Sequence, residues 1–303
     1  MKKQIQTLEL TIPNRRELLM GVGIIMVVLY HYDTGLWFQK FFYPGFLGVD
    51  IFLFISGYGL CRSFERNKIH TFFRRRIKRI LPMFLLLAIV KCSLYVLGGG
   101  YLSLSDWFFS LTSLSYWGTG GVFVDWYLCG LLALYLFFPL LYKLPVWGGA
   151  VLCFLACFVS VFFRLEWYHQ CLLLRLPIFY LGICCYKHSF VKAFKSSLLI
   201  FGVAFVLFVV LWFNRLTHTF TIIYPLAPFV ILGISVLLAK SKNSFIILKW
   251  IGKHSLEIYV TDCIVMQLIS NHWILIPSIM YFVLLGLITP AVCFINKKCM
   301  CKI

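Results

Sequence analysis

The sequence predicts an all-α, polytopic integral membrane protein, and two observations support this fold class. First, 62% of the 303 residues are hydrophobic and the mean hydropathy is +0.92, whereas soluble domains are about 45–50% apolar. Second, apolar segments of about 17 to 25 residues follow one another along almost the whole chain, and each is long enough to cross the hydrocarbon core as a helix. We therefore expect a single transmembrane domain over residues 1–303.

The apolar segments predict about ten transmembrane helices. A polar N-terminal segment, 1–16, precedes the first helix, and the stretch GVDIFLFISGYGL opens near the start of the second. A basic run ending at Pro82 leads into the third. The segment 98–121 has no basic residue and is rich in aromatic and hydroxyl side chains, so it is expected to be interfacial or re-entrant. The bundle would cover 17–295, followed by a tail at 296–303; the expected spans are 17–37, 45–63, 80–97, 124–143, 147–163, 171–187, 197–213, 221–239, 254–270 and 274–295.

The basic residues predict the orientation in the membrane, because cytoplasmic loops carry an excess of Lys and Arg. If the N-terminus is cytoplasmic, 23 of the 28 Lys and Arg residues fall in cytoplasmic segments. Only Lys40, Arg164 and Arg215 fall in outer segments. Both termini should therefore be cytoplasmic. The net charge of +18 follows from the same sorting and suits anionic lipid headgroups, so it does not indicate a nucleic-acid partner.

Ionisable side chains inside the expected spans are candidates for function, because burying a charge in lipid is costly. His31 and Asp50 lie nine or ten residues from the turn of the first helical hairpin, which places them at similar depth. If they face each other, Asp50 accepts a hydrogen bond from His31, fixes its tautomer and raises its basicity. A purely structural contact between two helices is the alternative. The full set is His31, Asp50, Lys91, Asp125, Arg175 and Asp262.

The stretch HTFFRRRIKRILPMF places five basic residues within six positions at the expected cytoplasmic surface. Such a run orients membrane proteins, and that role alone would explain it. Clustered Arg side chains also bind phosphates in bidentate fashion. Arg75, Arg76 and Arg79 are therefore candidate ligands for a cytoplasmic polyanion such as coenzyme A.

Three motifs in order resemble those of the membrane acyltransferase family 3, whose members O-acylate cell-surface sugars. GVGIIMVVLYH ends at His31, GVDIFLFISGY contains Asp50, and RRIKRILP contains Arg79. The spacing is similar to that of the family, and the likeness covers most of the chain. Two positions depart from the family pattern: Met20 stands where the family usually has Arg, and Asp262 where many members have His. Arg15 or Arg16 could replace the missing Arg, or the activity could be altered.

The resemblance implies an integral membrane O-acyltransferase of the bacterial inner or plasma membrane. It would transfer an acetyl or other short acyl group from acyl-CoA, without a metal, to a hydroxyl of a cell-surface polysaccharide or lipid-linked glycan. O-acetylation in polysaccharide biosynthesis is the expected role. In this mechanism His31 is the general base on the sugar hydroxyl and Asp50 orients it. Arg175 is the candidate oxyanion donor, or else it neutralises Asp50 or Asp125 as a buried ion pair.

Two further residues are candidate contacts for the acceptor sugar. Asp125 and Trp126 lie together at the expected outer mouth of the fourth helix, and a carboxylate beside an aromatic ring suits a carbohydrate. An acid at a helix start next to an interfacial Trp is the simpler interpretation. A membrane transporter or flippase for a glycan or lipid-linked sugar is the alternative function, because it would also use intramembrane His, Asp and Arg.

Overall fold

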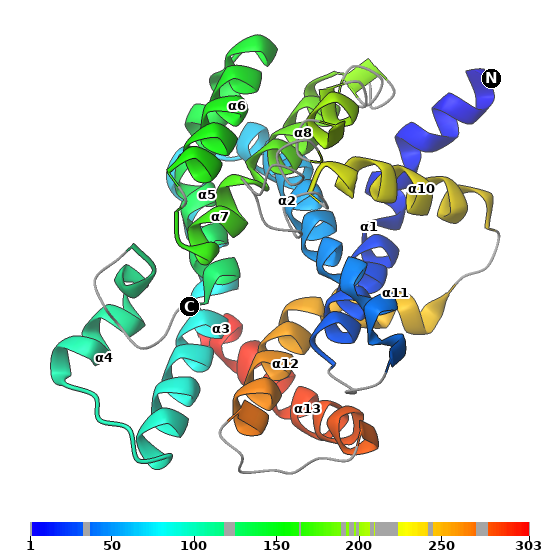
Figure 1. The fold of residues 1–303 in the computed structure, drawn as a ribbon. Coiled ribbons are helices and arrows are strands. Elements are labelled where there is room, and N and C mark those ends of the chain that lie inside the picture. Colours follow the sequence, from blue (N-terminus) through cyan, green and yellow to red (C-terminus); the bar gives the residue numbers. More distant parts are fainter. Residues whose placement is uncertain are drawn as a thin grey trace. The chain divides into compact units, whose positions relative to one another are not determined.

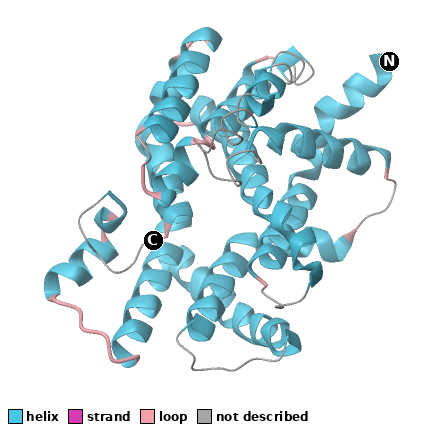
Figure 2. Ribbon diagram, in the orientation of Figure 1, coloured by secondary structure: helices cyan, strands magenta, loops and turns pink. Residues whose placement is uncertain are grey.

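A computed structural model describes the chain apart from twelve stretches, and every element in the described part is a helix (Figure 2). The all-α prediction is thereby confirmed for these residues. The described residues form two compact units, one drawn from 1–30, 40–68 and 137–253 and the other from 31–39, 69–136 and 254–303. The residues outside the description are 1, 33–36, 118–124, 164, 189–191, 194–196, 198–199, 207–208, 210–223, 242–244, 271–277 and 303.

The first unit contains most of the N-terminal helix and the middle of the chain. Its elements are α1 (Lys2–His31, up to Tyr30), most of η1 (Trp37–Leu47), α2 (Gly48–Arg66), the end of α5 (Trp126–Lys143), α6 (Val146–Phe162), α7 (Trp167–Leu173), α8 (Leu176–Lys187), η4 (Tyr224–Leu226), α10 (Ala227–Lys240) and α11 (Ile246–Lys253).

The second unit contains the helix with the basic run and the C-terminal helices, and in it α12 packs against both α3 and α13. Its elements are α3 (Ile69–Leu97), α4 (Leu104–Leu111), η2 (Leu114–Trp117), the first part of α5, α12 (Ser255–Ser270) and α13 (Ser278–Lys302). His31, at the end of α1, belongs to this unit.

Glycines allow close helix contacts in the first unit, where α2 and α8 lie side by side (Figure 1). A Cβ atom added at Gly57 would lie 2.1 Å from the Phe179 carbonyl oxygen, and one at Gly182 would lie 2.2 Å from the Phe54 carbonyl oxygen. At Gly48 it would lie 2.2 Å from the carbonyl oxygen of Gly23 in α1. Small residues on α2 therefore admit neighbouring backbones.

Five segments of the described chain are long and apolar enough to cross a membrane. Two shorter apolar helices, Val146–Phe162 and Tyr224–Ala239, coincide with two other predicted spans. The predicted span 197–213 lies partly outside the described residues, which include 197, 200–206 and 209 within it. The ten-span topology therefore stays a prediction; the five segments are Phe41–Arg66, Ile69–Leu97, Trp126–Lys143, Trp167–Lys187 and Met280–Met300.

One predicted helix boundary was wrong, and one predicted span is divided into two helices within the membrane-length segment Trp167–Lys187. Pro82 does not open α3, because the helix begins at Ile69 and Pro82 lies inside it; a proline removes one backbone hydrogen bond but does not have to end a helix whose flanking residues favour it. The span 171–187 is not one helix, because α7 ends at Leu173 and Arg175 is the N-cap residue of α8. Pro177 lies in the first turn of α8 and has no backbone N–H, so it cannot donate the hydrogen bond to the Leu173 carbonyl that a continuous helix would need.

The segment expected to be interfacial contains the short helix α4. Its N-terminus is closed by a capping box: the Asp106 amide donates to Ser103 Oγ at 3.2 Å, and the Ser103 amide donates to Asp106 Oδ2 at 2.9 Å. The hydrogen bonds from the Ser103 hydroxyl and amide lower the pKa of Asp106. Leu104 and Phe108 on the same helix are exposed, which suits a helix lying against lipid.

Candidate functional site

Arg175 is the largest fully buried side chain of the first unit, and protein groups surround its guanidinium. Its Nε donates to Asp50 Oδ2 at 3.3 Å. Nη1 donates to the Cys171 carbonyl and to the Tyr224 hydroxyl, each at 3.2 Å, and Nη2 donates to the Phe46 carbonyl at 3.4 Å. The rings of Phe46 and Tyr224 also face the guanidinium, with centroids 4.3 and 4.6 Å from Cζ. This arrangement combines an ion pair with two cation–π contacts.

The break between α7 and α8 places Arg175 at this position. Asp50 comes from the first turn of α2, Phe46 from η1 and Tyr224 from η4, so one cation joins four elements of the unit. Asp50 is 1% exposed and Arg175 is 0% exposed. Of the two roles considered for Arg175, the buried ion pair with Asp50 is present, and donation to an oxyanion stays a prediction.

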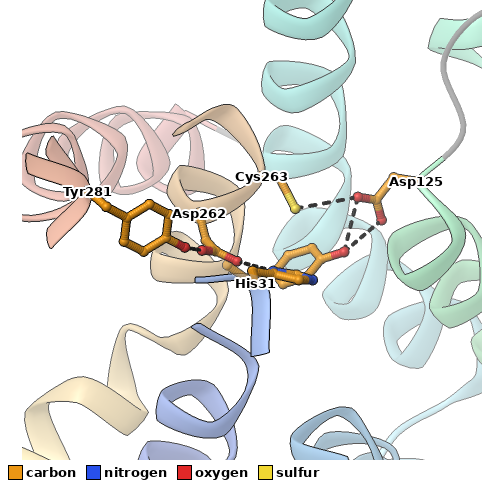
Figure 3. A network of polar contacts seen from close by, with 6 residues as sticks. His31, Asp125, Asp262, Cys263 and Tyr281 are labelled. Atoms are coloured by element: carbon orange, nitrogen blue, oxygen red, sulfur yellow. Dashed lines mark hydrogen bonds and ion pairs between the residues drawn. The ribbon is translucent and has the colours of Figure 1, made fainter. Parts of the chain in front are cut away.

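His31 pairs with a carboxylate in the second unit. Its Nδ1 lies 2.5 Å from Asp262 Oδ2, and the Tyr281 hydroxyl donates to the other oxygen, Oδ1 (Figure 3). The Asp262 side chain is fully buried, whereas that of His31 is 27% exposed. The carboxylate is therefore enclosed while part of the imidazole remains open, which suits a base that must meet a substrate.

Asp125 lies in the same unit and caps the start of α5. Its Oδ1 accepts from the Leu128 amide at 2.7 Å, and its Oδ2 accepts from the Tyr259 hydroxyl at 3.1 Å. The Cys263 thiol lies 3.9 Å from the same Oδ2 (Figure 3). Asp125 is 4% exposed, so its carboxylate serves the helix start and the contact with α12. A sugar contact by Asp125 and Trp126 stays a prediction.

The arginines of the basic run differ in exposure along α3. Arg75 is exposed, whereas Arg76 and Arg79 are half-buried. Arg76 lies close to Tyr135 of α5, and that tyrosine is buried. Arg76 and Arg79 are three residues apart and share one face of the helix. Of the three candidate arginines, Arg76 and Arg79 are therefore the two that are partly buried in the second unit.

The position that lacks the family arginine is occupied by a buried apolar side chain, since Met20 is 8% exposed. Arg15, one of the two candidate replacements, donates to the carbonyls of Leu238 and Ser241 at the end of α10. A cation at a helix C-terminus satisfies carbonyls that have no partner within the helix. Arg15 therefore makes a structural contact at the end of α10, and replacement of the family arginine by Arg15 or Arg16 stays a prediction.

The structure contains one expected pair of site residues and one pair that was not expected. Asp50 binds Arg175, and His31 binds Asp262, whose partner role was not predicted. His31 and Asp50 belong to different units, so the hydrogen bond between them stays a prediction. The cost of an acid inside a span identified Asp262 as a candidate, but it does not indicate which residue the acid binds. The neighbouring tyrosines, Tyr224, Tyr259 and Tyr281, carry no comparable signal.

The fold and the site together indicate a helical membrane protein with polar sites inside its units. The observations are the membrane-length apolar helices, the buried Arg–Asp pair and the partly exposed His–Asp pair. Within that class, the model of acyltransferase family 3, described as an acyltransferase domain, matches residues 17–296. The chain belongs to this family and is a membrane acyltransferase by that membership. No curated protein and no solved structure gave a match.

Proposed function

We propose that the protein is a multi-pass O-acyltransferase of the cell membrane. It transfers an acetyl or other short acyl group from acyl-CoA to a hydroxyl of a cell-surface polysaccharide or lipid-linked glycan. The observation that carries this proposal is the His31–Asp262 pair, with its buried carboxylate and partly exposed imidazole, in a chain that matches the acyltransferase family over 17–296. In the proposed topology, ten helices span the membrane and both termini are cytoplasmic.

In the proposed reaction, the unprotonated ring nitrogen of His31 removes the proton of a sugar hydroxyl. The oxygen attacks the thioester carbonyl, and a tetrahedral oxyanion forms. As this intermediate collapses, the carbon–sulfur bond breaks and the coenzyme A thiolate leaves, taking up the proton from His31. General-base catalysis of this kind contributes about 10²- to 10⁴-fold to the rate.

The donor would bind through its phosphates to the basic face of α3. Arg76 and Arg79 are half-buried, so their contacts with phosphate would be less screened by water than those of an exposed side chain. Arg75 would add charge at the surface. For the oxyanion, Arg175 remains the proposed donor, and it would have to exchange one of its present protein partners for the intermediate.

A direct assay tests this proposal. Purified protein in lipid nanodiscs is incubated with acyl-labelled acetyl-CoA and an extract of lipid-linked and polymeric glycans, and label on the glycan is measured. We expect transfer by the native chain and none by His31→Ala at equal amounts of folded protein. Equal transfer by both proteins would contradict the proposal.

A transporter or flippase for the same glycans is the second candidate. Met20 in place of the family arginine, together with the buried pair of Asp50 and Arg175, favours it, since intramembrane charges also mark transport pathways. Movement of a labelled lipid-linked glycan across reconstituted vesicles without acyl-CoA would support transport. No movement, together with label transfer, would support the enzyme.

A further inference from the structure

Asp262 contacts His31 and Tyr281 through different oxygens. Oδ2 lies 2.5 Å from His31 Nδ1, and Oδ1 accepts from the Tyr281 hydroxyl (Figure 3). Asp262 lies on α12, Tyr281 on α13 and His31 at the end of α1. Three segments distant in the sequence therefore meet at one buried carboxylate.

The neighbouring residue strengthens this junction. Tyr32 follows His31 directly, and its ring packs against those of Tyr281 at 5.4 Å and Phe282 at 4.9 Å between centroids. Tilted aromatic pairs at such distances are favourable beyond their buried area. The end of α1 is thus held to α13 by ring packing and to α12 by a hydrogen bond, which restricts the orientation of the imidazole.

The contact also determines which ring nitrogen carries the proton. An ionised carboxylate only accepts hydrogen bonds, and Tyr281 occupies the other oxygen as a donor. With Asp262 ionised, Nδ1 of a neutral His31 ring is the atom that donates to Oδ2, which leaves the lone pair on Nε2. A base needs that lone pair, so the carboxylate selects the reactive nitrogen as well as the orientation.

We propose that Asp262, held in place by Tyr281, is the positioning residue for His31 and fixes it as the Nδ1–H tautomer. This inference rests on the proposed function for its kinetic consequence, but the tautomer itself does not depend on activity. Asp50 was expected to have this role from the sequence. Asp50 accepts from Arg175 within its own unit, whereas Asp262 is the carboxylate that lies within hydrogen-bond distance of His31 in the second unit.

The first experiment records the tautomer directly. Protein labelled with ¹⁵N-histidine is placed in nanodiscs, and the ring nitrogen shifts are measured at a pH at which the ring is neutral. The chain has seven histidines, and the signal missing from His31→Ala identifies His31. We expect a protonated Nδ1 and an unprotonated Nε2 in the native chain, and a shift toward the opposite tautomer in Asp262→Asn.

The second experiment measures kcat and KM for the same variants. Asp262→Asn keeps the side-chain volume but removes the charge. We expect kcat to fall by about 10²- to 10⁴-fold, with little change in the KM for acyl-CoA or the KM for the glycan. Tyr281→Phe removes one hydrogen bond and should lower kcat by about 3- to 10-fold. Added to Asp262→Asn, it should have no further effect, because Tyr281 acts through Asp262. Asp262→Glu should restore part of the rate.

A matched control comes from the same pair of helices. Asn296 Nδ2 donates to Glu257 Oε1 at 2.6 Å and links α13 to α12 at another level. Asn296→Ala should leave both the His31 signal and kcat unchanged. If Asn296→Ala lowered kcat as much as Tyr281→Phe does, the effect of Tyr281 would be one of helix packing, and the proposal would be overturned.

The two experiments separate this inference from the proposed function. If His31→Ala retains full transfer but the Nδ1–H signal depends on Asp262, general-base catalysis is wrong and the positioning contact stands. If His31→Ala abolishes transfer but Asp262→Asn changes neither the His31 signal nor kcat, general-base catalysis by His31 stands and the positioning role of Asp262 is wrong. A native His31 protonated at Nε2, or a signal that changes in Asp50→Asn and not in Asp262→Asn, would overturn the assignment to Asp262.

Discussion

The Arg175 guanidinium is buried without exposure to solvent, and Asp50 supplies the charge that balances it. An ion pair of this kind need not stabilise a fold more than apolar packing would. Removing one partner, however, leaves a buried charge uncompensated, at a cost of about 3–5 kcal/mol. The pair therefore acts first as a constraint on the elements that it joins, α2, η1, η4 and the start of α8.

We expect Asp50→Asn and Arg175→Gln each to lower the thermal stability and the folded yield of the protein, because each leaves one buried charge. The combination of both changes should recover part of the loss. The fraction of folded protein that remains after heating is measured by size-exclusion chromatography. Arg66→Gln is the control, because Arg66 is an exposed residue on α2, the helix that carries Asp50. A double variant as unstable as the sum of the two single variants would argue against the pair as the cause.

The basic face of α3 leads to a second prediction at this scale. Arg76→Gln and Arg79→Gln should each raise the KM for acyl-CoA, because a lost contact with phosphate in a half-buried place costs about 1.5 to 3 kcal/mol. Arg75→Gln should cost at most about 1 kcal/mol, since Arg75 is exposed. Steady-state kinetics with varied acyl-CoA test this. Equal effects at all three positions would contradict the division by exposure.

The sequence identifies the ionisable residues whose burial costs free energy, but it does not identify the residues that they bind. His31, Asp50, Arg175 and Asp262 stand out because each is ionisable and lies in an apolar segment. The partner of His31 is 231 positions away, and that of Arg175 is 125 away. Helical periodicity gives the face of a single helix, but it does not determine which distant helix lies against that face.

At the scale of the elements, glycine positions determine how closely the helices pack. Gly57 and Gly182 lie where the backbones of α2 and α8 meet, whereas a Cβ atom at Gly59 would have nothing within 4 Å. The three glycines therefore have different roles, although Gly57 and Gly59 are only two residues apart. Close contact replaces the hydrophobic effect as the source of helix association in lipid.

We expect Gly57→Ala and Gly182→Ala to destabilise the first unit by about 1–3 kcal/mol, the usual range for overpacking. Gly59→Ala is the matched control on the same helix, and it should be neutral or stabilising because alanine favours helix formation. Thermal stability in detergent provides the comparison. Loss of stability in Gly59→Ala equal to that in Gly57→Ala would mean that the contact with α8 is not the cause.

The all-helical class could be predicted, because continuous apolar runs of membrane length favour helices. The boundaries were harder to predict at prolines. Pro82 lies inside α3, whereas Pro177 follows the break before α8. A proline near the start of a helix costs little, and one inside it is tolerated when neighbouring residues maintain the helix. The residue type alone does not distinguish these two cases.

At the scale of the whole molecule, the distribution of charge is the strongest argument for orientation. The basic run on α3 and the lysines at the C-terminal end of α13 should both face the cytoplasm, since Lys and Arg near the membrane surface resist translocation. The segment with α4 has no basic residue between 98 and 121. Its capped helix carries exposed apolar side chains, as expected at the outer interface.

Labelling from outside the cell tests this orientation. A cysteine introduced at Ser105 should react with an impermeant maleimide in intact cells, and one at Lys68 should react only after the cells are opened. A reporter enzyme that is active only in the cytoplasm should be active when it is fused after Ile303. The native chain, which has its own cysteines, gives the background. Labelling at Lys68 but not at Ser105 in intact cells would invert the topology and would place the arginines of α3 on the side that lacks acyl-CoA.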